Sequence, residues 1–252
     1  MTRTALITGA TAGIGNAFAR ELARRGTNLV IVARSTDRLE QVAADLRARH
    51  GIEVEVITAD LATSEGIDHV AHRLTEAGRP IDLLVNNAGA SLAGWFGTTD
   101  IADEDHQLHL LVRAPMHLMD AALKSMSGRG QGGIINVASV AAFTPRGTYS
   151  AHKAWLVNLS QWANLQYGNV GITVQALCPG FTRTEFHQRM EADIADVPRW
   201  MWLKADHVAK ASLRDLERGK AISVPSLRYK VLASLARHAP AGLVASIAKR
   251  GR

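Results

Sequence analysis

Short runs rich in Val, Ile and Leu alternate with longer helical patterns, and this alternation restricts the possible folds more than any other feature. Seven runs are typical of strands buried on both faces: Thr4–Thr8, Asn28–Val32, Glu53–Thr58, Ile81–Val85, Gly133–Val137, Ile172–Leu177 and Ala221–Val224. Helical periodicity occupies the segments between them: Gly15–Arg25, Thr36–Arg49, Glu65–Ala77, Asp103–Ser127, Tyr149–Tyr167 and Asp206–Arg218, which Asp206 is expected to cap. The alternation predicts an α/β protein with a parallel sheet built from right-handed βαβ units.

No repeat, linker or low-complexity segment interrupts this pattern, so residues 1–252 are interpreted as a single domain. Two segments stand outside the alternation. Residues 181–204 are expected to form a substrate lid, although its aromatic side chains could equally pack on the body or on another subunit. Residues 226–252 form a basic, apolar tail that we expect to cover a sheet edge or dock on a partner subunit, with binding to an anionic membrane as a less favoured alternative.

Composition excludes several classes of protein. With 47% hydrophobic and 21% charged residues the chain is not generally disordered, and no apolar run is long enough to span a bilayer. The first strand starts too early for a secretory leader, and Cys178 is the single cysteine, so we expect a cytoplasmic location. The net charge of +6 suits an anionic ligand. The sequence contains no block of five like charges, so nucleic-acid binding is not expected. Histidine pairs at helical spacing lack a third ligand, so no metal site is expected.

A glycine-rich turn follows the first strand and opens the first helix. It reads Thr8-Gly9-Ala10-Thr11-Ala12-Gly13-Ile14-Gly15. Glycine lets the backbone approach a phosphate closely, and the helix N-terminus presents free N–H groups and positive dipole to a pyrophosphate. The turn therefore predicts a dinucleotide site that includes Gly9, Thr11, Gly13, Ile14 and Gly15; a tight turn without a ligand is the alternative.

The residues after the second strand indicate which dinucleotide is bound. An NAD site usually places a carboxylate there for the ribose 2′-hydroxyl, whereas this chain has Arg34 and Ser35. A guanidinium suits a 2′-phosphate, so we expect NADP(H) to be preferred over NAD(H); a surface arginine is the alternative. After the third strand, Asp60 and Leu61 could meet the adenine, although Asp60 or Ser64 could instead cap a helix.

Tyr149 and Lys153 are four residues apart and therefore share one face of a helix. A tyrosine normally titrates near pH 10, and a nearby cation lowers its pKa by favouring the phenolate. Such a pair can act as a general acid and base on a ketone or alcohol. Taken alone, this spacing is a weak signal, because an ordinary surface pair explains it better.

Several motifs occur together in one order along residues 1–225. They are Gly9-xxx-Gly13-x-Gly15, Asn86-Asn87-Ala88-Gly89, Ser139, Tyr149-xxx-Lys153 and Cys178-Pro179-Gly180. In this order the chain resembles the short-chain dehydrogenase/reductase family. The resemblance implies a three-layer Rossmann-like fold, in which a doubly wound, parallel, seven-stranded sheet carries helices on both faces.

The resemblance also implies roles for individual residues. Tyr149 would be the acid and base, Lys153 would bind the nicotinamide ribose and tune Tyr149, and Ser139 would hydrogen-bond the substrate oxygen. Further residues would line the cofactor: Asn86, Asn87, Ala88, Gly89, Pro179, Gly180, and Thr182 or Thr184. Ser139 could instead cap a turn, and either threonine could be a simple turn residue. Relatives commonly form homodimers or homotetramers through two long helices, the second of which here carries Trp155 and Trp162, although both could be core residues.

Two positions depart from the family pattern. Leu111 stands where members usually carry an asparagine that supports a proton relay, and Ser139 lies 10 residues before Tyr149 where 13 is typical. The primary interpretation is an NADP(H)-dependent oxidoreductase that interconverts a hydrophobic ketone and a secondary alcohol. The alternative is a cofactor-binding regulatory or interaction protein with weak or no catalysis.

Overall fold

A computed structural model describes residues 3–185 and 197–238. Its centre is a parallel sheet of seven strands in the order β3-β2-β1-β4-β5-β6-β9. The strands are β1 (Thr4–Thr8), β2 (Asn28–Ala33), β3 (Val54–Thr58), β4 (Leu83–Asn86), β5 (Gly132–Val137), β6 (Ile172–Leu177) and β9 (Ile222–Ser223). All seven predicted strands are present, and the order reverses between β1 and β4, where open α/β sheets bind ligands.

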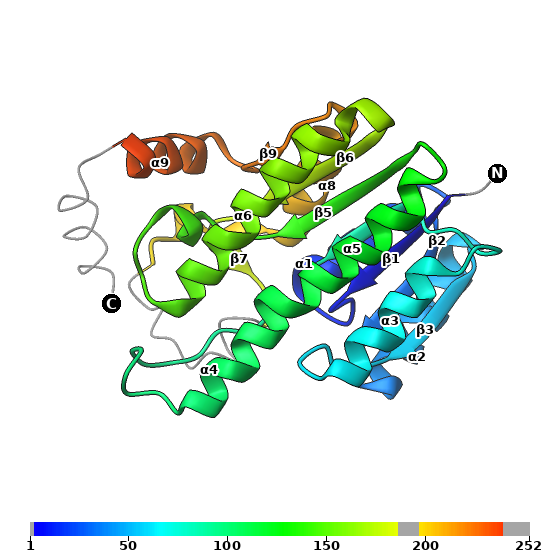
Figure 1. The fold of residues 1–252 in the computed structure, drawn as a ribbon, viewed down its shortest axis with the longest axis horizontal. Helices are drawn as coiled ribbons and strands as arrows, with labels where there is room; N and C mark the ends of the chain where they lie inside the picture. The colour runs from blue at the N-terminus through cyan, green and yellow to red at the C-terminus, as the bar shows by residue number, and fades with distance from the viewer. Residues whose placement is uncertain (1–2, 186–196, 239–252) are drawn as a thin grey trace.

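Helices cover both faces of this sheet, so the predicted Rossmann-like architecture is confirmed (Figure 1). On one face lie α1 (Gly13–Arg24), α2 (Thr36–His50) and α8 (Ala205–Glu217). On the other lie α3 (Ser64–Thr75), α4 (Ile101–Leu108), α5 (Ala114–Ser127) and α6 (Thr148–Tyr167). Phe18 anchors the first layer and Leu118 the second, each almost wholly buried.

The predicted cap of α8 is wrong. The helix begins at Ala205 with Lys204 in the cap position, and no side chain caps it. Asp206 lies in the first turn instead, where its carboxylate pairs with Arg20 of α1. A carboxylate in the first turn still complements the helix dipole, so the residue type fits although its role differs.

The predicted helix Asp103–Ser127 begins earlier, at Ile101, where the Asp100 carboxylate accepts a hydrogen bond from the Ala102 amide at 2.9 Å. It also contains a π-helical turn, His109–Arg113, between α4 and α5. Pro115 explains this turn, because proline has no N–H to give to the carbonyl four residues earlier and its ring would crowd that carbonyl.

The segment 181–204 is not a plain loop, because its two ends pair as short parallel strands. These are β7 (Thr182–Arg183) and β8 (Leu203–Lys204). The Phe181 and Trp202 rings also meet there, with their centroids 5.7 Å apart. Phe186 and Met190, two of the apolar residues expected in the lid, lie outside the described residues. The two ends of the segment are therefore held to each other.

The tail begins with α9 (Leu227–His238), which packs against the segment after β6 (Figure 1). Of the two expected sites, the sheet edge is therefore not the one that α9 covers, and docking on a partner subunit stays a prediction. Its Tyr229 side chain is buried, donates to the Met201 carbonyl at 2.8 Å and accepts from the Phe181 amide at 3.1 Å. The periodic stripe Leu227, Val231 and Leu235 is exposed. No helix in the described part of the chain has the length and hydropathy to span a membrane.

Candidate active site

The glycine turn joins the end of β1 to the start of α1, and each of its glycines meets a different constraint. Gly9 and Gly13 adopt positive φ angles of 67° and 57°, which other residues rarely adopt. A Cβ on Gly15 would lie 2.3 Å from the Gly9 carbonyl oxygen, so a side chain there would force the turn open. The turn thus presents bare backbone and the N-terminus of α1 to a wide groove. This cradle fits a dinucleotide pyrophosphate.

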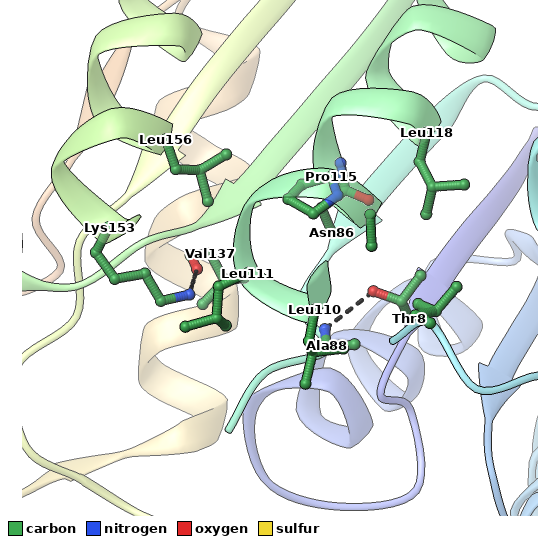
Figure 2. Close-up of a pocket in the computed structure, with 12 residues that line it drawn as sticks. Thr8, Asn86, Ala88, Leu110, Leu111, Pro115, Leu118, Val137, Lys153 and Leu156 are labelled. Atoms are coloured by element: carbon green, nitrogen blue, oxygen red, sulfur yellow. Dashed lines mark hydrogen bonds between the residues drawn. The ribbon is translucent and has the colours of Figure 1, made fainter. Parts of the chain in front are cut away.

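The motif after β4 holds the turn in place. The Asn87 amide donates to the Thr8 carbonyl at 2.8 Å and to the Gly9 carbonyl at 3.2 Å. The Thr8 hydroxyl accepts from the backbone amide of Asn87 at 2.9 Å. It also accepts from the backbone amide of Ala88 at 2.9 Å (Figure 2). Thr8 was missed as a functional residue, because its role depends on a strand that is adjacent in space and distant in sequence.

At the ribose end of the groove, Arg34 and Ser35 follow β2 and both line the cavity. Ser35 also caps α2, accepting from the Arg38 amide at 3.5 Å, and the Arg38 guanidinium pairs with Glu185 at 2.9 Å. Two arginines, Arg34 and Arg38, therefore line the groove beyond β2, and Arg38 is held by a carboxylate.

Asp60 and Leu61 also line this end, as the adenine prediction requires. The competing prediction, that Asp60 or Ser64 caps α3, is wrong. Thr63 is the cap, accepting from the Gly66 amide at 3.1 Å. The Asp60 carboxylate instead accepts from the Ala62 amide at 3.0 Å and so shapes the turn beside the groove.

Ser139 and Tyr149 meet, although only ten residues separate them. A 3₁₀ helix, Val140–Phe143, and a tight turn at Gly147 with φ of 90° bring the chain directly into α6. The Ser139 hydroxyl caps the 3₁₀ helix by accepting from the Ala141 amide at 3.1 Å, and it also hydrogen-bonds the Tyr149 side chain. Ser139 therefore caps a turn, which is one of its two expected roles, and its hydroxyl lies beside the Tyr149 side chain.

Burial sets the acidity of the Tyr149–Lys153 pair. It raises the pKa of Tyr149 to about 12, against a smaller lowering by the Ser139 hydrogen bond, and it lowers the pKa of Lys153 to about 8. The Lys153 ammonium donates to the Val137 carbonyl at 2.7 Å and lies 5.7 Å from the centre of the Tyr149 ring. The pKa of Tyr149 is therefore raised and not lowered as expected, because desolvation of the phenol outweighs the Ser139 hydrogen bond.

Leu111 lies beside this pair, in the π-helical turn, and is almost fully buried. A Cβ on Gly89 would lie 3.2 Å from the Leu111 side chain and 3.9 Å from the Lys153 ammonium nitrogen. Figure 2 shows Leu111 and Lys153 at the edge of a cavity of about 10 Å³, which has room for roughly one water molecule. An apolar side chain thus occupies the position beside Lys153 where the family usually has an amide.

The segment after β6 completes the nicotinamide end of the groove, and it depends on the tail. A Cβ on Gly180 would lie 2.0 Å from the Tyr229 ring, so only glycine allows α9 to pack there. Thr182 is buried and its hydroxyl donates to the Gly180 carbonyl at 2.9 Å. Thr184 lies over Gly13, and both threonines line the groove.

The expected site residues, except Gly15 and Asn86, line one groove of about 1440 Å³ in the described part of the chain. Beyond the glycine turn and Tyr149 its walls become apolar, with side chains from the segment after β4, from the lid and from α9: Leu92, Trp95, Phe96, Phe181, Met201 and Leu232. Sequence reasoning missed the contribution of α9, because nothing in its helical periodicity indicates which surface it covers. Groups of three or more potential metal ligands are absent from the residues that the structure describes.

Comparison with known proteins identifies relatives of this chain. The family model for short chain dehydrogenase matches residues 3–195. A very-long-chain 3-oxoacyl-CoA reductase from Anas platyrhynchos is 34% identical over 189 residues, which cover 72% of this chain and 60% of the duck protein. The match thus spans well under two thirds of that relative.

Two solved structures are similar over nearly the whole length of both chains. A short-chain dehydrogenase from Sphingobium yanoikuyae in complex with NADPH has a TM-score of 0.85 at 35% identity, covering 96% of this chain and 95% of its own. The bulky-bulky ketone specific alcohol dehydrogenase from Comamonas testosteroni has a TM-score of 0.81 at 34% identity, covering 96% and 94%.

Proposed function

Because this chain belongs to the short-chain dehydrogenase/reductase family and is an NAD(P)-dependent oxidoreductase, we propose that it interconverts a hydrophobic ketone and a secondary alcohol with NADP(H). The observation that carries the proposal is the hydrogen bond between Ser139 and Tyr149 in a groove that also contains the glycine turn. This bond supports the proposal, because a substrate oxygen beside it could contact a proton donor and a second hydroxyl together.

The chain's own residues supply the proton chemistry. When bound, the nicotinamide provides or accepts a hydride at the substrate carbon. During reduction Tyr149 donates its proton to the carbonyl oxygen, while the Ser139 hydroxyl holds that oxygen in place. The raised pKa of Tyr149 keeps the phenol protonated until the oxygen becomes basic. Lys153, one turn later, would bind the nicotinamide ribose and stabilise the resulting phenolate.

Three observations support the preference for NADP(H) and for a bulky apolar ketone. Arg34 lines the ribose end of the groove, where no carboxylate follows β2. The Sphingobium relative binds NADPH, and the Comamonas relative is specific for bulky-bulky ketones. The apolar walls contributed by Trp95, Phe181 and Leu232 suit such a substrate.

The decisive experiment follows NADPH oxidation with a panel of bulky ketones in wild-type protein and Tyr149→Phe. We expect the substitution to lower kcat by roughly 10²–10⁴-fold while NADPH still binds, because it removes one proton donor and little else. Equal rates in the two proteins would exclude Tyr149 as the acid.

The same assay tests the alternative, a regulatory protein that binds the cofactor without turnover. Leu111 motivates this alternative, since it places an apolar side chain beside Lys153. Tight NADPH binding by wild-type protein, with no oxidation across the whole ketone panel, would favour it over catalysis.

Assembly, location and domain organisation complete the proposal. We propose a single catalytic domain that includes the lid and tail and forms a homodimer or homotetramer in the cytoplasm. Exposed apolar side chains on α4 to α6, among them Leu108, Met116 and Trp162, support the assembly, and the buried single Cys178 is compatible with the location. Sedimentation equilibrium tests the assembly.

A further inference from the structure

The positive charge of this chain is concentrated at its C-terminal end. Residues 218–252 contain eight lysines and arginines and no aspartate or glutamate, whereas residues 1–217 contain 21 basic and 23 acidic residues. The arginines that line the groove, Arg34, Arg38 and Arg146, all precede this segment, so a dinucleotide in the groove does not account for the segregation. Charge separated in this way indicates a further anionic partner.

Helix α9 presents part of this segment at the periphery of the molecule (Figure 1). Its Tyr229 and Ala233 side chains are buried and hold the helix to the body of the protein. On its outer face Leu227, Val231 and Leu235 recur every four residues, and they are 78%, 52% and 60% exposed. We call these three residues the α9 stripe. The described part of the chain therefore leaves a row of aliphatic side chains in water.

Basic side chains flank the α9 stripe. Successive residues of a helix are about 100° apart, so Arg228 borders one edge of the stripe and Lys230 borders the other. Both side chains are exposed. The Arg228 guanidinium also lies 5.9 Å from the centre of the Trp200 ring, which is itself more than half exposed. Aliphatic, cationic and aromatic side chains thus meet on one surface.

This combination fits an anionic lipid bilayer better than it fits other anionic or apolar partners. An amphipathic helix can lie in the interface of a membrane, with its aliphatic side chains among the acyl chains and its cations at the headgroups. A nucleic acid would neutralise the charges but would leave the α9 stripe in water. A second copy of the chain, docked through the same surface, would bring two positively charged helices together, which is unfavourable.

We propose that the α9 stripe, with Arg228 and Lys230, docks the protein on an anionic phospholipid surface. The positive charge of residues 218–252 strengthens this contact. Leu232 and Ala236, on the neighbouring face of α9, line the groove, so docking brings the groove close to the bilayer. The docking goes beyond the proposed ketone reduction and does not depend on it.

The test measures binding of the full chain to vesicles by flotation in a density gradient. We expect binding to vesicles of phosphatidylcholine that contain about 30% phosphatidylglycerol, in about 0.1 M NaCl. Binding to vesicles of phosphatidylcholine alone should be weaker by about tenfold or more, because the cations then find no net negative charge. Raising the salt to about 0.5 M should also weaken binding to the anionic vesicles, because it screens the surface potential.

One variant removes the apolar contribution. It combines Leu227→Gln, Val231→Gln and Leu235→Gln, which keep good helix formers or introduce them at exposed positions. We expect its apparent dissociation constant for the anionic vesicles to rise by about tenfold or more, because the aliphatic area that would enter the acyl region is lost. Circular dichroism and Tm should match those of the wild-type protein, which shows that the fold is intact.

A second variant removes the charge contribution. Arg228→Gln combined with Lys230→Gln should weaken binding to the anionic vesicles by about tenfold or more. The matched control combines Arg49→Gln and Lys124→Gln, which remove the same charge from exposed positions on α2 and α5. This control should bind within about threefold of the wild-type protein, because a surface outside the contact contributes little.

Three outcomes would overturn the proposal. The first is no binding of the wild-type protein to the anionic vesicles, or equal binding by the wild-type protein and both α9 variants. The second is tighter binding to duplex DNA than to the anionic vesicles, lost with Arg228 and Lys230 but kept when the α9 stripe is substituted, which would assign the surface to a nucleic acid. The third is a fall to monomer in the stripe variant without vesicle binding by the wild-type protein, which would assign the surface to a second copy of the chain.

Discussion

Tyr149 and Lys153 illustrate how burial changes the chemistry that a spacing suggests. Four-residue spacing puts them on one helix face, but the ammonium donates to the Val137 carbonyl and both groups are desolvated. Burial penalises the charged form of each, so the tyrosine pKa rises to about 12 and the lysine pKa falls to about 8. Burial therefore disfavours both the phenolate of Tyr149 and the ammonium of Lys153, and a bound ligand or substrate would have to stabilise these charged forms.

The lowered pKa of Lys153 predicts a pH limit on ketone reduction. Lys153 carries its charge below its pKa of about 8 and loses it above, so kcat/KM should fall as pH rises through that value. A pH–rate profile between pH 6 and 10 measures this limb, and Lys153→Met should remove it together with most of the activity. A wild-type rate that stays flat to pH 10 would show that the lysine charge is not needed.

Arg34 predicts which nicotinamide cofactor is preferred. Removing the guanidinium in Arg34→Ala should weaken NADPH binding by roughly 10–100-fold, the worth of a charge-assisted hydrogen bond, and leave NADH binding nearly unchanged. Fluorescence titration of both cofactors provides the measurement. Arg49→Ala is the matched control, since Arg49 lies at the far end of α2. Equal losses for NADPH and NADH would contradict a role in binding a 2′-phosphate.

Helix α9 contacts the groove wall after β6 through the Tyr229 side chain. The Tyr229 ring occupies the space that a side chain at residue 180 would need, and its hydroxyl bridges the Phe181 amide and the Met201 carbonyl. The two ends of the lid and the nicotinamide end of the groove are therefore tied to a single helix. Changes in α9 should consequently reach the substrate pocket without touching the glycine turn.

Gly180→Ala tests this coupling. The added methyl would collide with the Tyr229 ring, so we expect a loss of stability of about 1–3 kcal/mol from overpacking. In a Tyr229→Ala background the same substitution should cost at least about 1 kcal/mol less, because the space is then open. Urea unfolding of the four proteins completes the cycle. Additive effects would mean that the ring and the glycine do not interact.

Two irregular elements explain how the departures from the family pattern are accommodated. The 3₁₀ helix Val140–Phe143 shortens the path from β5 to α6, so the missing residues do not separate Ser139 from Tyr149. The π-helical turn at Leu111 follows from Pro115 in the next helix. Neither element could be predicted from periodicity, because each involves only four or five residues.

Cofactor binding should stabilise the whole folded domain. The groove lies along the carboxyl ends of the central strands and contacts both halves of the sheet. NADPH at about 100 times its dissociation constant should stabilise the folded state by about 2.7 kcal/mol. For a chain of this size that corresponds to a rise in Tm of roughly 5–11 °C. Calorimetry with NADPH, and with NADH at the same concentration as control, measures the rise. An unchanged Tm at saturating NADPH would contradict a cofactor site in the groove.

Local sequence was sufficient for the strands, most helix bounds, the glycine turn and the Tyr149–Lys153 pair, because each is encoded by contiguous residues with period two, period 3.6 or fixed spacing. Other features required the folded chain: the meeting of Ser139 with Tyr149, the support of the turn by Thr8 and Asn87, and the packing of Tyr229 over Gly180. These contacts join segments far apart in sequence, and desolvation depends on what surrounds a group in three dimensions. A pattern along the chain shows neither these contacts nor the degree of desolvation.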